Sequence, residues 1–200
     1  MNLLILNGSL RGQTGNTGRV TEILARLANA RGLDGTVLTL AEPRPRHRWE
    51  AAMREADALF VLTGAYWGSC GSVLQGWLEE ATPHEGTDLF LGKPVAVGIT
   101  SDSVGGLGVA LRLIYALNCF GCVLPAQGMV IISRVANELI RERGDLHPDV
   151  QDVWGARDLA TALDHLLATP RIEYESWDVE RGSGVRDFDP FYPFDLGEDG

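Results

Sequence analysis

The chain has 200 residues and a mass of 21.7 kDa, and 45% of its residues are hydrophobic while 22% are charged. These values fit one domain, or one domain with an arm, of ordinary globular composition. The formal net charge of −10 argues against general binding to nucleic acids or anionic membranes, because both attract a cationic surface.

Three further features of the sequence bear on the cellular compartment. No apolar run approaches the roughly 20 residues of a membrane span. Residues 1–6 lack the basic stretch of a signal peptide, and three cysteines, an odd number, do not make a disulfide framework. We therefore expect a cytoplasmic protein with neither a membrane nor a nucleic-acid partner.

Apolar runs that predict buried strands alternate with segments of helical periodicity. The strand-like runs are residues 3–6, 37–40, 58–62, 95–100 and a stretch within 123–132 that is interrupted near Pro125. The helical segments are 20–28, 46–56, 73–81, 107–118 and 153–167. This alternation predicts a flavodoxin-like, three-layer α/β/α fold whose five-stranded parallel sheet has the order 2-1-3-4-5.

In such a sheet, ligands bind beyond the carboxyl ends of the strands, near the point where the strand order reverses. The loops after the first, third and fourth predicted strands meet there, and they comprise residues 8–16, 63–72 and 101–106. All three loops are rich in glycine and small polar residues, and the connections at the opposite end are less so. We therefore expect these three loops to form the functional site.

The first loop has the composition of a phosphate-binding site. Its donors are the hydroxyls of Ser9, Thr14 and Thr17, the amide of Asn16 and the guanidinium of Arg11. Gly15 lets the backbone approach an anion, and the following helix offers free N–H groups and a positive dipole end. A phosphate monoester suits this set. The alternative is a glycine-rich turn in which Thr17 or Asn16 merely caps the helix.

Other phosphate-binding motifs do not match the sequence. There is no GxxxxGK[ST] loop for a nucleoside triphosphate, because Lys93 is followed by Pro94, and no GxGxxG dinucleotide fingerprint. A Cys-x5-Arg phosphatase loop is also excluded, since no arginine stands at the sixth position after any cysteine.

The segments 7–11 and 15–17, which read NGSLR and GNT, resemble the NGSxR…GNT loop of the NADPH-dependent FMN reductases and related iron–sulfur-flavoprotein-like proteins of the flavodoxin fold. In that family the loop holds the FMN phosphate. The resemblance covers about residues 2–130. It implies FMN as the cofactor and NADPH or NADH as the co-substrate.

The second loop is similar to the family's sPxYwgsmsgxLK segment, and the resemblance implies contacts with the flavin ring. The residues implied are Gly64, Ala65, Tyr66, Trp67 and Gly68. Aromatic side chains with a polar end are suitable walls for a flat heteroaromatic ligand. The alternative is that Tyr66 and Trp67 only seal the edge of the sheet.

The second loop also departs from the family pattern at three positions. Gly64 replaces a proline, Gln75 a lysine and Glu79 an aspartate. Glycine leaves φ free where proline fixes it, so we expect a looser loop. Loss of the lysine is expected to weaken flavin binding or a subunit contact.

The third loop resembles the family's gKpv…tsG…gG stretch. The residues implied in flavin binding are Thr100, Ser101, Gly105 and Gly106. The amides of Gly105 and Gly106 are expected near the pyrimidine side of the flavin, where they stabilise negative charge as an oxyanion hole does. The alternative is that these two glycines only start a helix.

We predict no metal ion and no iron–sulfur cluster. Cys119 and Cys122 form a CxxC pair, a spacing that occurs in redox disulfides and metal sites. The pair lies away from the expected ligand end, however, and no second CxxC or histidine-rich segment supplies further ligands. We interpret both cysteines as small buried residues.

Residues 171–200 differ from the rest of the chain. They hold nine acidic residues, three arginines and six of the fifteen aromatic residues. Because acidic disordered tails are normally poor in aromatics, we interpret this segment as an arm that docks on its own domain or on a second subunit; the alternative is a loose tail. The predicted division is therefore a flavodoxin-like FMN-binding domain at 1–170 and an acidic, aromatic arm at 171–200.

The helix at 107–118 is apolar on more than one face, so we expect a homodimer or homotetramer. The leading functional hypothesis is an FMN-dependent NAD(P)H oxidoreductase of the FMN reductase or quinone reductase kind, which passes electrons to a quinone, an azo compound or free flavin. No side chain is predicted as catalytic, because the cofactor performs the chemistry. The alternatives are a flavodoxin-type electron carrier and a non-catalytic flavin-binding module.

Overall fold

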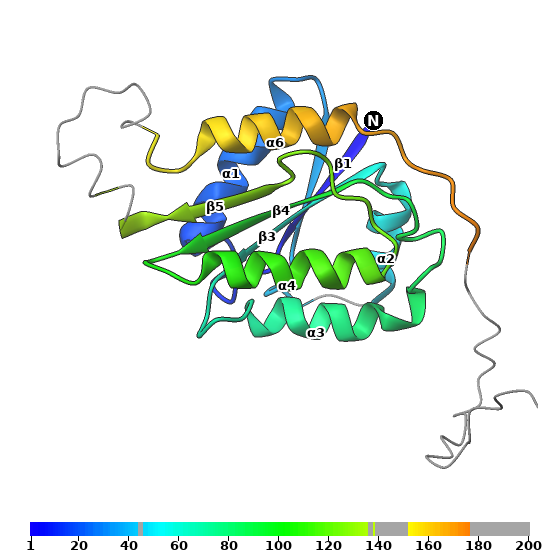
Figure 1. Ribbon diagram of the computed structural model, residues 1–200, viewed down its shortest axis with the longest axis horizontal. Coiled ribbons are helices and arrows are strands. Elements are labelled where there is room, and N and C mark those ends of the chain that lie inside the picture. The colour runs from blue at the N-terminus through cyan, green and yellow to red at the C-terminus, as the bar shows by residue number, and fades with distance from the viewer. Residues whose placement is uncertain (44–45, 136–137, 139–151, 177–200) are drawn as a thin grey trace, which may run out of the picture.

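The structure is a computed structural model that describes residues 1–43, 46–135, 138 and 152–176. Five parallel strands form one sheet in the order β2-β1-β3-β4-β5 (Figure 1), so the predicted fold and strand order are confirmed. The strands are β1 (Asn2–Asn7), β2 (Asp34–Thr39), β3 (Ala58–Gly64), β4 (Val95–Ser101) and β5 (Met129–Ser133).

Helices cover both faces of the sheet and make the three layers visible in Figure 1. The helices are α1 (Asn16–Asn29), α2 (Arg46–Glu55), α3 (Ser72–Ala81), α4 (Gly106–Cys119) and α6 (Ala156–Ala168), with short 3-10 turns η1 (Gly12–Thr14) and η2 (Thr82–His84). One apolar core joins the sheet to α1 and α6, and the other joins it to α2, α3 and α4. None of the helices in the described ranges is long and apolar enough to cross a membrane.

The two central strands explain why these apolar runs form a parallel sheet. Every residue of β3 and β4 is buried, because helices lie on both faces. On the α2–α3 side, Trp49 and Trp77 are fully buried and meet edge to face with their ring centroids 5.7 Å apart. This packing fixes the strands, and it fixes the loops that leave their carboxyl ends.

The fifth strand is interrupted near Pro125, as the sequence predicts. The apolar stretch from residue 123 does not form a continuous strand: Val123 makes an isolated parallel bridge with Pro94, and β5 begins only at Met129. Pro125 lies between them and has no N–H to donate to a ladder. The interruption therefore shortens the strand at its amino end and leaves its carboxyl end in register with β4.

The prediction of two buried cysteines is wrong for one of them. Cys122 is buried, and burial raises the pKa of its thiol to about 12. Cys119 is exposed, because it lies on the solvent side of the last turn of α4. All three cysteines are free thiols.

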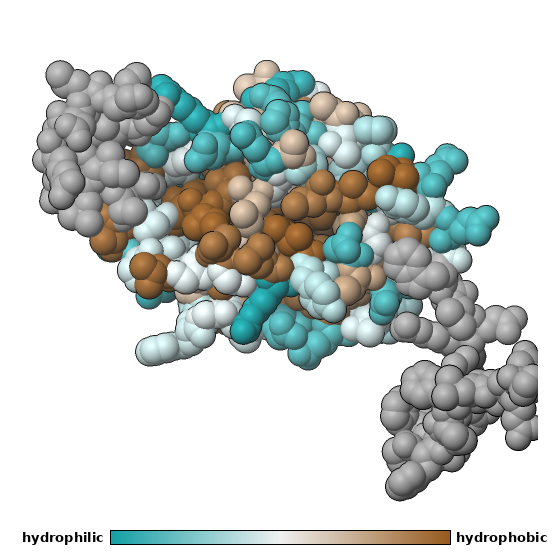
Figure 2. Space-filling model, viewed as in Figure 1, coloured by the Kyte–Doolittle hydropathy of each residue, from teal (hydrophilic) through white to brown (hydrophobic). Residues whose placement is uncertain are grey.

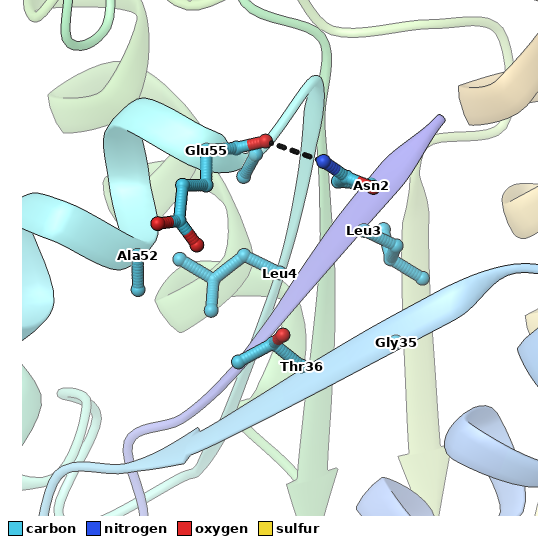
Figure 3. A pocket seen from close by; sticks show the side chains of 8 residues that line it. Asn2, Leu3, Leu4, Gly35, Thr36, Ala52 and Glu55 are labelled. Atoms are coloured by element: carbon cyan, nitrogen blue, oxygen red, sulfur yellow. Dashed lines mark hydrogen bonds between the residues drawn. The ribbon is translucent and has the colours of Figure 1, made fainter.

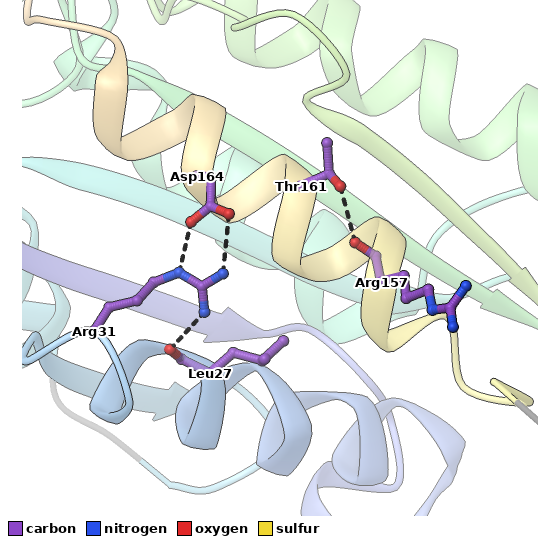
Figure 4. Close-up of polar contacts among 5 residues, drawn as sticks. All are labelled: Leu27, Arg31, Arg157, Thr161 and Asp164. Atoms are coloured by element: carbon purple, nitrogen blue, oxygen red, sulfur yellow. Dashed lines mark hydrogen bonds and ion pairs between the residues drawn. The ribbon is translucent and has the colours of Figure 1, made fainter. Parts of the chain in front are cut away.

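An ion pair joins the two helices on one face of the sheet (Figure 4). The Arg31 guanidinium, just after α1, donates to both carboxylate oxygens of Asp164 on α6, with N···O distances of 2.6 and 3.0 Å. It also donates to the carbonyl of Leu27 at 2.9 Å. The hydrogen bonds from Arg31 lower the pKa of Asp164.

The described part of the arm lies against the body of the same chain, beside the amino ends of the strands. Ile172 N–H donates to the carbonyl of Gly92 at 3.0 Å, and the Ser176 hydroxyl donates to the carbonyl of Gly86 at 2.9 Å. The Ile172 backbone lies so close to Gly92 that a Cβ there would overlap it, and Gly92 also has a φ of +72°. Residues 177–200, with five of the six aromatics of the predicted arm, lie outside the described residues.

Candidate functional site

A cavity of ≈ 270 Å³ opens at the carboxyl ends of the strands, where the sequence predicts the site. Its walls come from the loops after β1, β3 and β4 and from the residue after β5. The lining residues are Ser9, Arg11, Gly15, Asn16, Thr17, Gly64, Ala65, Tyr66, Thr100, Ser101, Asp102 and Arg134. Ten of these twelve are predicted site residues.

The loop after β1 is held in shape by its own side chains. Buried Asn7, the last residue of β1, donates to the carbonyl of Gly12 at 3.1 Å and accepts from the Ser9 N–H at 3.1 Å. The Ser9 hydroxyl in turn accepts from the Arg11 N–H at 3.3 Å. Asn7 was not predicted as a site residue, although its position directly before the loop is visible in the sequence. It acts by positioning the loop.

The amino end of α1 is open toward the cavity. Gly15 is the N-cap, in an extended conformation, and no side chain of the described residues caps the helix, so the first N–H groups of α1 lack the usual partner there. Gly15, Asn16 and Thr17 all line the cavity. The alternative that Asn16 or Thr17 merely caps the helix is wrong. An uncapped helix start with glycine at the cap is suited to an anion.

Three hydroxyl groups that line the cavity differ in their partners. Thr17 and Thr100, both buried, share a hydrogen bond of 2.7 Å between α1 and β4. The Ser101 hydroxyl is also buried, but it has no hydrogen-bond partner within the described part of the chain. Because a buried polar group is normally paired, this hydroxyl fits a ligand that completes it. The cavity therefore fits a phosphate ester with further polar groups.

Tyr66 forms a wall of the cavity beside the first loop. Its ring lies over Gly64, where an added Cβ would come within 2.9 Å of the ring, and its hydroxyl lies 3.4 Å from the Ser9 hydroxyl. Glycine at position 64 thus lets the tyrosine fold over the end of β3. Thr63 ties the two loops together, since its hydroxyl donates to the carbonyl of Gly8 and accepts from the Gly71 N–H.

Trp67 and Gly68 form the tip of a two-residue turn. The Tyr66 and Ser69 backbones exchange hydrogen bonds of 2.8 and 2.9 Å around it, and both tip residues have positive φ, +51° and +78°. Positive φ is uncommon for a residue other than glycine, and the Trp67 side chain is 106% exposed. The turn therefore holds the indole in solvent beside the cavity and not in its wall.

Five predicted site residues do not line the cavity: Thr14, Trp67, Gly68, Gly105 and Gly106. The Thr14 hydroxyl donates to the carbonyl of Arg11 at 2.9 Å. Gly105 is the N-cap of α4 with a φ of +96°, and buried Gly106 packs against Ile131. Their roles toward a ligand stay predictions.

Asp102 and Arg134 line the cavity but were not predicted. The Asp102 carboxylate accepts from the Asn16 side-chain amide at 3.2 Å. Arg134 directly follows β5 and has its side chain 47% exposed. The same carboxyl-end rule that selected the other loops, applied to the fifth strand, would have found Arg134.

A second cavity, of ≈ 350 Å³, lies at the opposite end of the sheet (Figure 3). It lies between the amino ends of β1 and β2 and the last turns of α2, where the Asn2 side chain donates to the carbonyl of Glu55 at 3.0 Å. None of its lining residues is a buried polar group without a partner. It is the larger of the two cavities, but it is not at the ligand end.

The fold is flavodoxin-like, and its carboxyl-end cavity lies at the uncapped start of α1. A family model, NADPH-dependent FMN reductase, matches residues 1–137. The chain therefore belongs to the NADPH-dependent FMN reductase family. It is an oxidoreductase with FMN as its cofactor and NAD(P)H as its co-substrate. No curated protein matches the chain in sequence.

Solved structures show the same fold at low sequence identity. An NADH:FMN oxidoreductase (EMOB) in its apo form is 18% identical, with a TM-score of 0.62 and coverage of 88% of this chain and 92% of that one. The NAD(P)H:(acceptor) oxidoreductase FerB from Paracoccus denitrificans is 20% identical, with a TM-score of 0.59 and coverage of 84% and 98%. An archaeal flavodoxin is 12% identical, with a TM-score of 0.58 and coverage of 84% and 99%.

Proposed function

We propose that this oxidoreductase passes electrons from NAD(P)H, through FMN held in the carboxyl-end cavity, to a small acceptor such as a quinone, an azo compound or free flavin. The observation that supports the cavity as the FMN site is the buried Ser101 hydroxyl, which has no partner among the described residues, together with the uncapped start of α1. Both are polar groups that a ligand completes. The family match supports the quinone-reductase-like assignment.

Each wall of the cavity has a separate task in this proposal. The amide groups at Gly15, Asn16 and Thr17, with the Ser9 hydroxyl and the Arg11 guanidinium, bind the phosphate of FMN. Ser101 donates to the cofactor, and Ala65 and Tyr66 bound the flavin ring. Bound FMN supplies hydride acceptance and onward electron transfer. The protein holds the cofactor, excludes water from its buried side and leaves one side accessible.

The test is the absorption spectrum of the purified full-length chain, before and after addition of FMN. We expect near-stoichiometric flavin absorbance that bleaches with NADPH and returns when a quinone is added. A protein that stays colourless and takes up no added FMN contradicts the proposal. Turnover with quinones, azo dyes and free FMN then ranks the acceptors.

A flavodoxin-type carrier is the second candidate, because the same fold and the same acidic charge are found in carriers. Carriers do not accept hydride from NAD(P)H directly. Reduction of the bound flavin by NADPH alone therefore favours the oxidoreductase, and reduction only by a partner protein favours the carrier. Steady-state turnover with any small acceptor contradicts a non-catalytic flavin-binding role.

We also propose that α4 forms a contact between two copies of the chain. Leu107, Leu111 and Tyr115 lie on one exposed stripe of this helix and are 53%, 54% and 73% exposed. Figure 2 shows that hydrophobic residues gather over β5 and the adjoining part of α4. An exposed apolar surface of this kind marks a protein contact. A homodimer or homotetramer is expected, and L111E should shift it to monomer in light-scattering measurements without loss of FMN binding.

The division into a domain at 1–170 and an arm at 171–200 is part of the proposal, as is a cytoplasmic location, where NAD(P)H is regenerated and thiols stay reduced. Arg171 to Ser176 already contact the body of the chain, so a truncation after Ser176 leaves those hydrogen bonds in place. If the remaining arm caps a neighbour's flavin, this truncation alters acceptor kinetics or assembly. Unchanged kinetics and mass contradict that role.

A further inference from the structure

The cavity has a cation at each of two separated positions. Arg11 belongs to the loop after β1, and Arg134 follows β5. Three inter-strand spacings separate β1 from β5 in the order β1-β3-β4-β5, so the two strands that these arginines follow lie about 14 Å apart. The two arginines therefore approach the cavity from different strands, Arg11 beside the start of α1 and Arg134 at the edge strand of the sheet.

The backbone around Arg134 is fixed to the neighbouring loop on both sides. The Ser133 hydroxyl donates to the carbonyl of Ser103 at 2.7 Å, and the Val135 N–H donates to the carbonyl of Asp102 at 3.2 Å. The guanidinium itself has a weaker partner, the carboxylate of Glu138 one turn later, at 3.4 Å. That exposed pair is easily exchanged for a ligand. The backbone beside Arg134 is thus held in place by hydrogen bonds, and its guanidinium can exchange Glu138 for a ligand anion.

Asp102 contacts both sides of the cavity. It follows β4, its carboxylate accepts from the Asn16 side-chain amide, and its carbonyl accepts from the Val135 N–H. A carboxylate beside the start of α1 repels a ligand anion, so it disfavours a phosphate placed between α1 and Arg134. The phosphate of FMN accounts for the Arg11 side in the proposed function. The Arg134 side has no assigned ligand.

We propose that Arg134 binds the 2′-phosphate of NADPH and thereby sets the preference for NADPH over NADH. This inference rests on the proposed function, because it needs FMN in the same cavity. NADPH differs from NADH by one phosphate monoester, and guanidinium is the side chain best matched to phosphate. Apart from Arg11, Arg134 is the only cationic side chain among the residues that line the described cavity.

The test compares R134Q and R134K with the wild type and with a matched control, R19Q. Arg19 is also exposed and paired with a glutamate on its own helix, at 2.9 Å, but it does not line the cavity. Equilibrium dissociation constants of NADP⁺ and NAD⁺ are measured for the FMN-loaded proteins, together with the dissociation constant of FMN. Adenosine 2′-monophosphate and adenosine serve as probes that lack the nicotinamide.

We expect R134Q to weaken NADP⁺ and adenosine 2′-monophosphate about ten- to a hundredfold, the range for a charge-assisted contact, and NAD⁺ and adenosine less than twofold. R134K should recover part of the loss, and R19Q should match the wild type. Equal losses for NADP⁺ and NAD⁺, or no loss for either, overturn the inference. If R134Q instead weakens FMN itself, Arg134 belongs to the flavin site. Failure of the wild type to bind FMN is a failure of the proposed function and is seen separately in the FMN titration.

Discussion

Both ends of the sheet have a cavity and a buried polar side chain, but only at the amino end does that side chain have a hydrogen-bond partner in the described residues. At the amino end, the buried Lys93 ammonium donates to the carbonyl of Met53 in the last turn of α2. At the carboxyl end, the buried Ser101 hydroxyl has no partner in the described residues. The amino end is complete without a ligand, and the carboxyl end is not.

The two cavities differ in whether their polar groups are hydrogen-bonded, and this difference favours the carboxyl-end cavity as the proposed ligand site although its volume is smaller. The amino-end cavity is larger, at ≈ 350 Å³ against ≈ 270 Å³, yet its polar groups are satisfied or exposed. An unpaired atom alone is not sufficient either, because buried Trp77 Nε1 also lacks a partner in the described residues and lies in the apolar core. The unpaired Ser101 hydroxyl, the open start of α1 and a cavity occur together at the carboxyl end, and this combination supports the proposed FMN site.

The largest effect should come from placing a carboxylate at the open helix start. Aspartate is a better N-cap than glycine, so G15D should keep or raise the melting temperature. The same carboxylate occupies the proposed phosphate position, and FMN affinity should fall on the order of a hundredfold, about 3 kcal/mol, through charge repulsion and occupied N–H groups. Fluorescence titration with FMN and thermal unfolding measure the two effects.

G15N is the matched control, because asparagine caps helices equally well without the negative charge. Its added Cβ meets the Arg11 side chain at 3.1 Å, as that of G15D does, so the steric change is shared. FMN affinity should fall much less in G15N than in G15D. Wild-type FMN affinity in G15D would show that the phosphate lies elsewhere.

At the other end of the sheet, Lys93 should affect stability and not cofactor binding. Burial, with a contribution from the nearby Arg171, lowers the pKa of Lys93 to about 8. The unfolded chain keeps this proton up to a pH of about 10.4, so the folded state gains stability as the pH rises from about 8 to about 10.5. The gain is up to about 3 kcal/mol.

Lys93→Met removes the titrating group. The wild type should therefore gain stability relative to K93M as the pH rises through this window, so the difference in unfolding free energy, wild type minus K93M, should increase. Urea unfolding at pH 7.5 and at pH 10.5 gives the two values for each protein. FMN affinity at pH 7.5 should be unchanged in K93M. A constant difference in unfolding free energy would mean that the lysine releases its proton at its ordinary pKa.

Most of the fold was predictable because its signals are local and repeated. Continuous apolar runs of four to seven residues define strands buried on both faces, and β3 and β4 are buried along their whole length. The fifth strand was less predictable. Its apolar stretch starts at Val123, which makes only an isolated bridge, and long-range pairing with β4 shows that the continuous strand begins at Met129.

The site residues that are neighbours in the sequence were predictable, and those that the fold brings together from distant parts of the sequence were not. The loop at residues 8–17 is recognisable from its composition alone. Asp102 accepts a hydrogen bond from Asn16 although the two residues are 86 positions apart in the sequence. Arg134 lines the cavity only because β5 pairs with β4. The family resemblance implies a flavin contact for Trp67, but the sequence does not reveal its positive φ or its exposed position at the tip of a turn.

Replacing Ser101 should have a smaller effect on FMN affinity, and it tests whether the unpaired hydroxyl at the carboxyl end binds the cofactor. S101A removes a buried hydroxyl without a partner, so the protein without FMN should be unchanged or up to about 1 kcal/mol more stable. With FMN the lost hydrogen bond should weaken binding roughly two- to tenfold. Chemical unfolding with and without FMN measures both. Destabilisation of the FMN-free protein would mean that Ser101 has a structural partner.

The smallest effect is expected at Arg31 and Asp164, which lie away from both ends. The pair is bidentate, but the Asp164 side chain is 57% exposed, and exposed ion pairs contribute little in water. D164N should lower the unfolding free energy by about 0.5 kcal/mol at neutral pH. Because Arg31 lowers the pKa of Asp164, the difference from wild type should shrink as the pH falls and the carboxylate is protonated. FMN affinity should not change in D164N. A loss of FMN affinity would indicate that the loss of this ion pair shifts α1 and with it the phosphate site at its amino end.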